Sequence, residues 1–170
     1  KFIVINSPMN PSGKVFSLDE LTFIAELVKK YDTYAICDEV YEHLVYDKWK
    51  HIPLMTLPGM RNRCVRISSA GKTFSMTGWK VGYSVASADI LVAVAKAHQF
   101  LTFATPPSLQ KAVAYGLNKN ESYFRSIGAD MVLKRNLLAG GLREIGFDVM
   151  ESQGTYFLGA DYRPLGFNRD

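Results

Sequence analysis

An apolar run that ends in two acidic residues decides the fold of this chain: it reads YAICDE at residues 34–39. A second apolar run, FIVI at residues 2–5, precedes it, and an amphipathic segment from Ser17 to Lys30 lies between the two. Ser17 and Glu20 form the Ser-x-x-Glu pattern that starts helices, and apolar residues recur after it at helical spacing. Strand, helix and strand of these lengths predict a right-handed βαβ unit and hence a parallel sheet.

The same patterns divide the rest of the chain. In chain order we expect strands at 65–68 and 81–86, a helix at 90–103, a helix that contains 109–117 and is opened by Pro106-Pro107, a helix at 121–144, and strands at 147–150 and 156–160. The last two strands are expected in a different sheet, because the pattern changes from alternating strands and helices to a helix followed by strands. The sequence therefore predicts an α/β domain over residues 1–127, then an interdomain helix and the beginning of a smaller α+β domain over residues 128–170.

Length and charge limit the class of protein. A chain of 170 residues is one domain, or one and a part. Its net charge of +4 suits phosphate and carboxylate ligands, and no dense Lys/Arg run indicates nucleic acid. No apolar run is long enough to cross a bilayer. The first residues already read as a strand, so we expect a segment of a longer, soluble polypeptide of the cytoplasm or an organelle.

Cysteines and histidines give no sign of a metal site. Cys37 and Cys64 lie in apolar runs without a CxxC pattern, which favours reduced core residues and, weakly, a reducing compartment. His43, His51 and His98 are scattered without metal-ligand spacing. We expect them to be surface or packing residues, and we expect no metal.

Polar side chains follow three of the predicted strands. Asn10 lies in the loop after the first strand, Asp38 ends the second, and Ser69 to Lys72 follow the third. In an open α/β sheet, ligands collect beyond the carboxyl ends of the strands. The sequence therefore predicts a ligand site at this edge.

The lysine of the third group has unusual neighbours. The chain reads SSAGKTFSMTGWKVGY from Ser68 to Tyr83, so Lys72 lies in a loop of small and hydroxylic residues, and Lys80 follows. A lysine can carry covalent chemistry as a Schiff base with an aldehyde cofactor. An exposed loop lysine is the simpler interpretation of such a residue taken by itself, and Asn-Pro-x-Gly at residues 10–13 is a good turn in any protein.

Three motifs in one order decide between these interpretations: Asn-Pro-x-Gly at 10–13, Asp-Glu-x-Tyr at 38–41 and the lysine segment at 68–83. Together they resemble the central part of fold-type I, pyridoxal-phosphate-dependent aminotransferases of class I/II, most closely the kynurenine/glutamine and aspartate/methionine branches. The similarity continues through residues 154–157. The resemblance implies a three-layer α/β/α large domain with a mostly parallel sheet, with pyridoxal phosphate as cofactor.

The resemblance also implies roles for the site residues. Lys72 would form the Schiff base with the cofactor aldehyde and move the substrate's α-proton. Asp38 would face the pyridine nitrogen, and Tyr41 and Asn10 would bond the phenolic oxygen of the cofactor. Ser69 and Lys80 would hold the phosphate, although many relatives have arginine at the second of these positions.

Other residues receive weaker expectations. Phe103 falls where some relatives place an aromatic residue that reaches the substrate pocket of the neighbouring subunit. Glu39 is expected to be structural or solvated, and Tyr156 with Phe157 to be the core of a strand. The substrate-carboxylate arginine of the family finds no match here, and neither Arg163 nor Arg169 is assigned to that role.

The function implied is transfer of an amino group from an L-amino acid to a 2-oxo acid, in a protein that is a homodimer at full length. Two alternatives stay open: a cysteine-conjugate β-lyase that uses the same site, and a non-catalytic, pyridoxal-phosphate-binding regulator. The regulator requires a DNA-binding segment, and none is visible in the sequence. The segment by itself is also open to being inactive.

Overall fold

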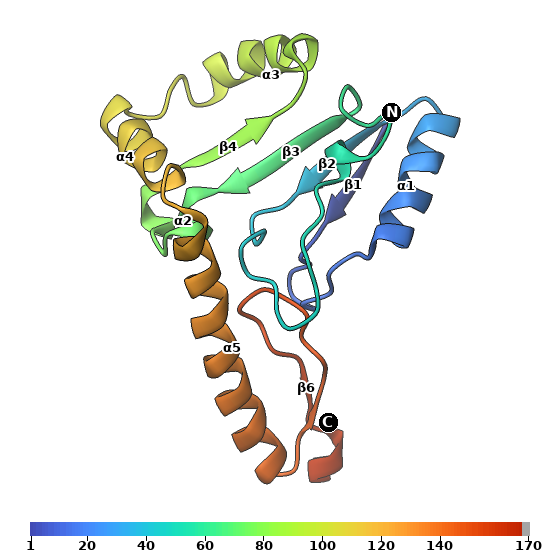
Figure 1. Cartoon of the computed structure of the whole chain (residues 1–170), viewed down its shortest axis with the longest axis vertical. Coiled ribbons are helices and arrows are strands. Elements are labelled where there is room, and N and C mark those ends of the chain that lie inside the picture. Colours follow the sequence, from blue (N-terminus) through green and yellow to red (C-terminus); the bar gives the residue numbers. More distant parts are fainter. Residues whose placement is uncertain (168–170) are drawn as a thin grey trace.

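A four-stranded sheet forms the centre of the upper part of the molecule (Figure 1). The computed structural model describes residues 1–167. The strands lie in chain order: β1 (Phe2–Asn6), β2 (Tyr34–Asp38), β3 (Cys64–Ser69) and β4 (Gly82–Val85). The first three are parallel and β4 is antiparallel to β3. The predicted βαβ unit and the mostly parallel sheet are confirmed.

Helix α1 (Leu18–Lys30) covers one face of this sheet. The helix begins at the predicted capping box: Ser17 Oγ accepts from the Glu20 N–H, and the Glu20 carboxylate accepts from the Ser17 N–H. Its buried stripe of Leu21, Ala25 and Val28 packs into the main core with inward-facing strand residues. The apolar period of the sequence thus fixes which side of α1 meets the sheet.

The opposite face of the sheet is apolar and largely exposed, although Ile90, Ala93 and Val94 of the helix after β4 line a shallow pocket with its residues. Phe2, Val4 and Tyr34 are exposed on this face, because successive strand residues point to opposite faces. The α/β fold class is confirmed, and α1 forms a helical layer on one face of the central strands.

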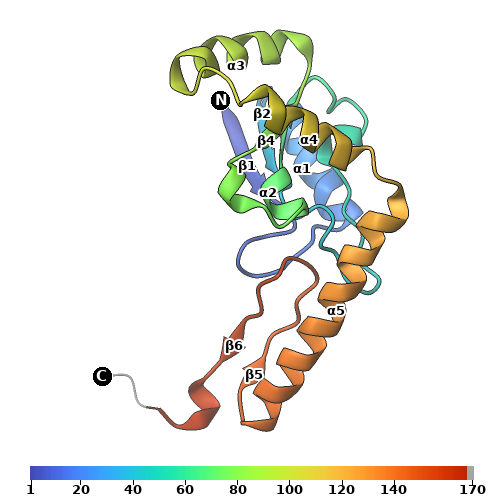
Figure 2. The same ribbon diagram turned by 90° about the vertical axis from the view of Figure 1, so that its left-hand side faces the viewer.

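Three helices follow β4: α3 (Ala88–Leu101), α4 (Pro107–Leu117) and α5 (Glu121–Glu144). Each lies within two residues of its predicted range. In α4, Val113 packs with Ala70 and Val81 in a second small core beside the end of β3. Helix α5 then runs from the sheet to the far end of the molecule (Figure 2). No helix within residues 1–167 is both long and apolar enough to span a membrane.

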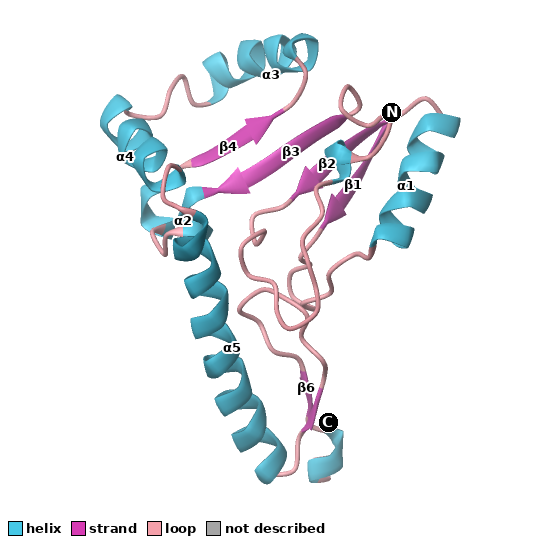
Figure 3. Ribbon diagram, viewed as in Figure 1, coloured by secondary structure: helices cyan, strands magenta, loops and turns pink. Residues whose placement is uncertain are grey.

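The last part of the chain is mostly irregular (Figure 3). Strands β5 (Asp148–Val149) and β6 (Ala160–Asp161) form a small antiparallel sheet beside α5. Of the strand predicted at 156–160, only Ala160 lies in a strand, and the rest of the prediction is wrong: the Thr155 N–H donates to the Leu44 carbonyl and the Phe157 N–H to the Thr155 hydroxyl. Four short helical turns were also missed: α2 (Ala70–Thr73), η1 (Leu54–Thr56), η2 (Thr77–Trp79) and η3 (Arg163–Leu165).

Candidate active site

The register of the sheet brings the ends of the parallel strands together. Asn6 of β1 pairs with Asp38 of β2, which pairs with Ile67 of β3. The carbonyl of Asp38 accepts hydrogen bonds from Asn6 Nδ2 (3.0 Å) and from the Ser7 N–H (3.1 Å). These contacts fix the backbone at Asp38, whose half-buried carboxylate therefore lies at the carboxyl edge of the sheet, as predicted.

Lys72 lies on the short helix α2, which follows β3 directly. The neighbours of this lysine in α2 are buried, and the Ala70 N–H donates to the Val81 carbonyl at 3.1 Å. A Cβ on Gly71 would lie 3.0 Å from Thr77 Cα, so the tight turn of the segment has little room for any side chain at that position. The glycine between Ala70 and Lys72 thus lets the loop fold closely around the lysine.

The Lys72 amine lies between two tyrosines. Its Nζ donates to the Tyr156 hydroxyl at 2.8 Å and lies 5.4 Å from the centre of that ring and 5.7 Å from that of Tyr41. The Tyr41 hydroxyl donates to that of Tyr156 at 3.2 Å, and the two rings meet edge to face, with centres 5.2 Å apart. No described carboxylate forms an ion pair with Lys72, so the amine is held by phenols alone.

The two phenols differ in acidity. The pKa of Tyr41 is raised by burial first, then by its hydrogen bond to Tyr156 and by the negative charge of Asp38. The pKa of Tyr156 is lowered, first by the hydrogen bond from Lys72 and then by that from Tyr41. Negative charge is therefore easier to place on the Tyr156 oxygen, beside the amine.

Tyr156 was predicted to be strand core, and this expectation is wrong. Its side chain is 47% exposed, and its neighbour Thr155 is fully buried with a left-handed φ of 68°. The Thr155 N–H donates to the Leu44 carbonyl at 2.9 Å, and the Tyr46 hydroxyl donates to the Thr155 carbonyl. These contacts turn the chain so that Tyr156 reaches the lysine. The similarity that continues through residues 154–157 was the available signal.

The remaining predicted site residues lie around this centre. Asn10 is exposed in the loop after β1, where its N–H donates to Asn6 Oδ1 at 2.7 Å. Ser69 is half-buried directly before α2, and Lys80 is exposed after η2 in a left-handed conformation with φ of 56°. Both flank the turn that carries Lys72. Their predicted contacts with the cofactor stay predictions.

Phe103 lies apart from these residues in sequence and in environment. It follows α3, has a left-handed φ of 63° and is 76% exposed. Its predicted reach into a neighbouring subunit's pocket stays a prediction.

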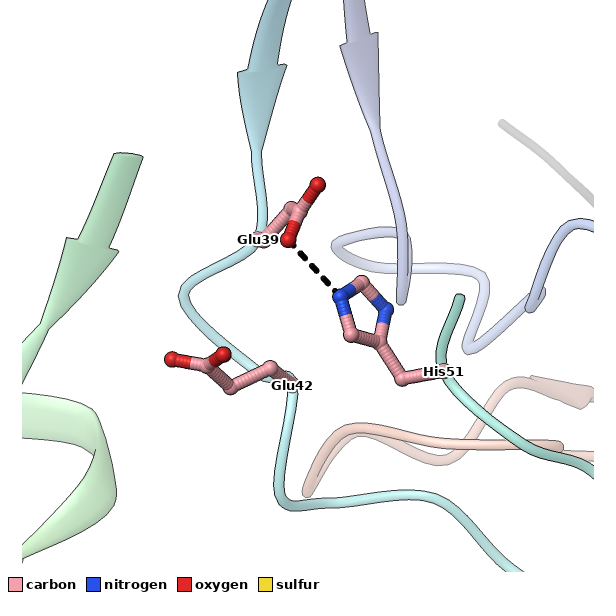
Figure 4. Close-up of side chains that lie close together, drawn as sticks. All are labelled: Glu39, Glu42 and His51. Carbon is pink, nitrogen blue, oxygen red and sulfur yellow. Dashed lines mark hydrogen bonds and ion pairs between the residues drawn. The ribbon is translucent and has the colours of Figure 1, made fainter. Parts of the chain in front are cut away.

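A buried charge cluster includes Glu39 and Glu42, which directly follow Asp38 and Tyr41 in the chain. Glu39, only 3% exposed, contacts His51 at 2.8 Å (Figure 4) and Arg66 Nε at 2.6 Å. Arg66 also forms an ion pair with Glu42. Glu39 is thus structural, and the alternative that it is solvated is wrong. The sequence did not indicate this cluster, because its members come from separate segments.

The cluster also has ligand atoms of the kind that metals use. One ligand atom each from Glu39, Glu42 and His51 lies within 4.8 Å of the others. The Arg66 guanidinium already supplies positive charge to both carboxylates. We therefore assign the cluster to fixing the loop and do not assign it to a cation.

The half-buried Lys72 amine at the carboxyl edge of a mostly parallel sheet lies where α/β proteins bind their ligands. The chain belongs to the aminotransferase class I and II family, whose model matches residues 1–168. It is 44% identical over 166 residues to a probable N-succinyldiaminopimelate aminotransferase of Mycobacterium tuberculosis, covering 98% of this chain and 42% of the relative. It is 43% identical over 174 residues to a kynurenine–oxoglutarate transaminase of Dictyostelium discoideum, covering 100% of this chain and 40% of the relative.

Solved structures show the same fold. The N-succinyldiaminopimelate aminotransferase of Mycobacterium tuberculosis superposes with a TM-score of 0.96 at 43% identity, over 99% of this chain and 44% of that one. YbdL of Escherichia coli, described as having a methionine aminotransferase function, gives a TM-score of 0.94 at 34% identity, over 100% and 45% of the two chains. The chain thus spans less than half the length of these relatives.

The enzymes of this family depend on pyridoxal phosphate, and the residues present fit that group. An aldehyde requires an amine free of a carboxylate partner, and Lys72 is held by phenols instead. A carboxylate stabilises the protonated form of a pyridine nitrogen, and Asp38 lies at the same sheet edge. The donor set of amine, carboxylate and hydroxyls matches the aldehyde, the ring and its oxygen substituents.

Proposed function

We propose that this protein is an aminotransferase that moves an amino group from an L-amino acid to a 2-oxo acid, with pyridoxal phosphate held on Lys72. The observation that carries the proposal is the position of the Lys72 amine, hydrogen-bonded to a phenol at the same sheet edge where β2 ends in Asp38. The relatives named above are aminotransferases, which favours amino transfer over the β-lyase and the regulator.

Each site residue has a defined task in this proposal. The cofactor supplies an electron sink for the bond that breaks at the substrate's α-carbon. Lys72 holds the cofactor aldehyde and, when free, takes and returns the proton at that carbon. Asp38 keeps a proton on the pyridine nitrogen, because a nearby carboxylate favours the charged form of a base. Tyr41 and Asn10 donate to the phenolic oxygen.

The phosphate would be held by two different kinds of donor. Ser69 offers a hydroxyl at the start of α2, and Lys80 offers a point charge after η2. Both residues flank Lys72, so a phosphate between them would set the distance from the aldehyde to the amine.

The remaining proposals concern the whole protein. Residues 1–127 belong to the large domain and residues 128–170 to the interdomain helix and the small domain, with the division inside α5. The full-length protein is a homodimer in which Phe103 contributes to the partner's substrate pocket. The exposure of Phe103 in the single chain supports that role.

Covalent mapping tests the proposal. The full-length natural protein is mixed with pyridoxal phosphate, reduced with borohydride and digested, and the modified peptide is identified by mass spectrometry. We expect the label on Lys72. Lys119 is the matched control, because its Nζ also bonds a tyrosine hydroxyl, that of Tyr115, at 3.0 Å. A label on another lysine, or on none, would contradict the proposal.

A further inference from the structure

The hydrogen bond between Lys72 and Tyr156 assigns a role that the sequence motifs did not. We propose that Tyr156 is a further catalytic residue: its hydroxyl holds the Lys72 amine whenever that amine is not covalently bound. The inference rests on the proposed role of Lys72. The contact joins residues 84 positions apart, at a distance of 2.8 Å.

A phenol suits both forms of the amine. Its oxygen accepts an N–H from the ammonium form, and its O–H donates to the lone pair of the neutral form. The Tyr41 hydroxyl donates to that of Tyr156 at 3.2 Å, which leaves the Tyr156 proton free to point at the neutral amine. The amine therefore keeps one partner through a change of protonation, and its nitrogen stays in place for attack and for proton transfer.

The contact is not explained by the burial of either residue. Tyr156 is 47% exposed, so water could satisfy its hydroxyl, and a hydrogen bond to Lys72 is not required to avoid a desolvation cost. A purely structural tyrosine at this position would need only its ring, which already contacts Tyr41 edge to face and Phe157 at 4.7 Å between ring centres.

The backbone that presents Tyr156 is fixed from several directions. A Cβ on Gly154 would lie 2.6 Å from the Leu44 carbonyl oxygen, and one on Gly13 would lie 2.7 Å from Ser152 Oγ. Ser152 Oγ itself donates to the Gly154 carbonyl at 3.0 Å. Such close backbone approach holds a side chain within the tolerance that catalysis needs.

The test measures the reactivity of the amine before any turnover. Full-length protein freed of cofactor is mixed with pyridoxal phosphate, and the covalent adduct is followed by absorbance and mapped after borohydride reduction. We expect Tyr156→Phe, which keeps the ring, to slow adduct formation at Lys72 about tenfold or more, since the amine loses the contact that holds its nitrogen in position for attack. Tyr115→Phe, which removes the same contact from Lys119, should leave that rate unchanged.

A second measurement distinguishes loss of the Tyr156–Lys72 hydrogen bond from a general loss of structure. In the Lys72→Ala background, Tyr156→Phe should have no further effect on the affinity for pyridoxal phosphate, because the partner of the hydroxyl is already gone. Thermal melting shows whether Tyr156→Phe is folded.

If Tyr156→Phe does not fold, the absorbance of tyrosinate is titrated in the wild type and in Lys72→Met. The hydrogen bond from Lys72 is the main cause that lowers the pKa of Tyr156, so Lys72→Met should raise the pH at which one tyrosine ionises.

The outcomes distinguish the two proposals. A wild-type label on Lys72 with an unchanged rate in Tyr156→Phe would overturn the role of Tyr156 and leave the aminotransferase proposal standing. A label on another lysine would overturn both. A slowed rate that persists as an additional loss of affinity in Lys72→Ala would make Tyr156 a general packing residue and contradict the inference.

Discussion

Asn6 and Asp38 end neighbouring strands in register, and the side-chain amide of Asn6 donates to the carbonyl of Asp38 at 3.0 Å. The same amide donates to the Pro8 carbonyl at 3.2 Å, and Asn6 Oδ1 accepts from the Asn10 N–H at 2.7 Å. One side chain thus ties together the strand end with the proposed ring partner and the loop that carries Asn10.

We therefore expect Asn6→Ala to lower both stability and affinity for pyridoxal phosphate. Loss of these hydrogen bonds at half-buried backbone groups should destabilise the protein by about 1–3 kcal/mol. Thermal melting and cofactor titration measure the two effects. Asn118→Ala is the control, because its amide bonds one helix-end carbonyl at 2.8 Å on the exposed end of α4. Equal loss of cofactor affinity in both variants would contradict this role of Asn6.

Asp38→Ala should separate covalent binding from turnover. The Lys72 amine remains, so borohydride should still label it, whereas kcat should fall about 10²–10⁴-fold because the ring nitrogen loses its carboxylate partner. Peptide mapping and steady-state kinetics check the two parts. Asp89→Ala, at an exposed position in the first turn of α3, is the control. Unchanged turnover in Asp38→Ala would refute the proposed role.

Arg66→Met should be strongly destabilising, because it leaves the buried carboxylates of Glu39 and Glu42 without their cation. Breaking a buried ion pair from one side costs about 3–5 kcal/mol. Arg63→Met is the matched control: its partner Asp32 is 86% exposed, so about 1 kcal/mol or less is expected. Denaturant unfolding of both variants measures the difference, and similar free energies of unfolding would argue against a buried cluster.

The first turn of α1 should be sensitive to acid. The pKa of Glu20 is lowered, first by its hydrogen bond from Lys14 and then by that from the Ser17 N–H. A depressed pKa stabilises the fold above the unfolded value, about 4.3, and this contribution is lost as the pH falls through the folded value.

Glu20→Gln should accordingly lower the Tm at pH 7, and its difference from the parent should shrink as the pH is lowered below about 4. Glu26→Gln, at an exposed position in the same helix, serves as control. Thermal melts across pH 3–7 provide the measurement, and a difference that grows in acid would have the wrong sign.

Gly154→Ala tests whether the close backbone packing at Gly154 holds Tyr156 in position. The new Cβ would lie 2.6 Å from the Leu44 carbonyl oxygen and 3.0 Å from Pro8 Cβ, so backbone must move. We expect a loss of about 1–3 kcal/mol in stability together with slower adduct formation at Lys72. Gly140→Ala in α5, where nothing lies within 4 Å, should instead be neutral or stabilising. An unaltered adduct rate in Gly154→Ala would show that the packing at Gly154 does not determine the position of the Tyr156 side chain.

The sequence predicted those features that depend on residues close together in the chain. The capping box at Ser17 and the strand that ends at Asp38 depend on local periodicity, and both could be located from neighbouring residues. The position of Lys72 at the sheet edge followed from topology, because parallel strands end on the same side.

The parts that could not be predicted depend on contacts between distant segments. Tyr156 is turned toward Lys72 by the left-handed backbone of Thr155 and by hydrogen bonds to residues 44 and 46, which no local pattern reports. Arg66, likewise, looks like an ordinary polar residue in a strand until Glu39 and Glu42 are placed beside it.

The long separation between Lys72 and Tyr156 has a consequence for synthesis on the ribosome. At about 5–20 residues per second, the 84 residues from Thr73 to Tyr156 take roughly 4–17 s to be added. During that interval the nascent sheet already carries the Lys72 amine without its Tyr156 partner. The proposed nucleophile therefore emerges first, and Tyr156 arrives only when the later segment docks against residues 44–46.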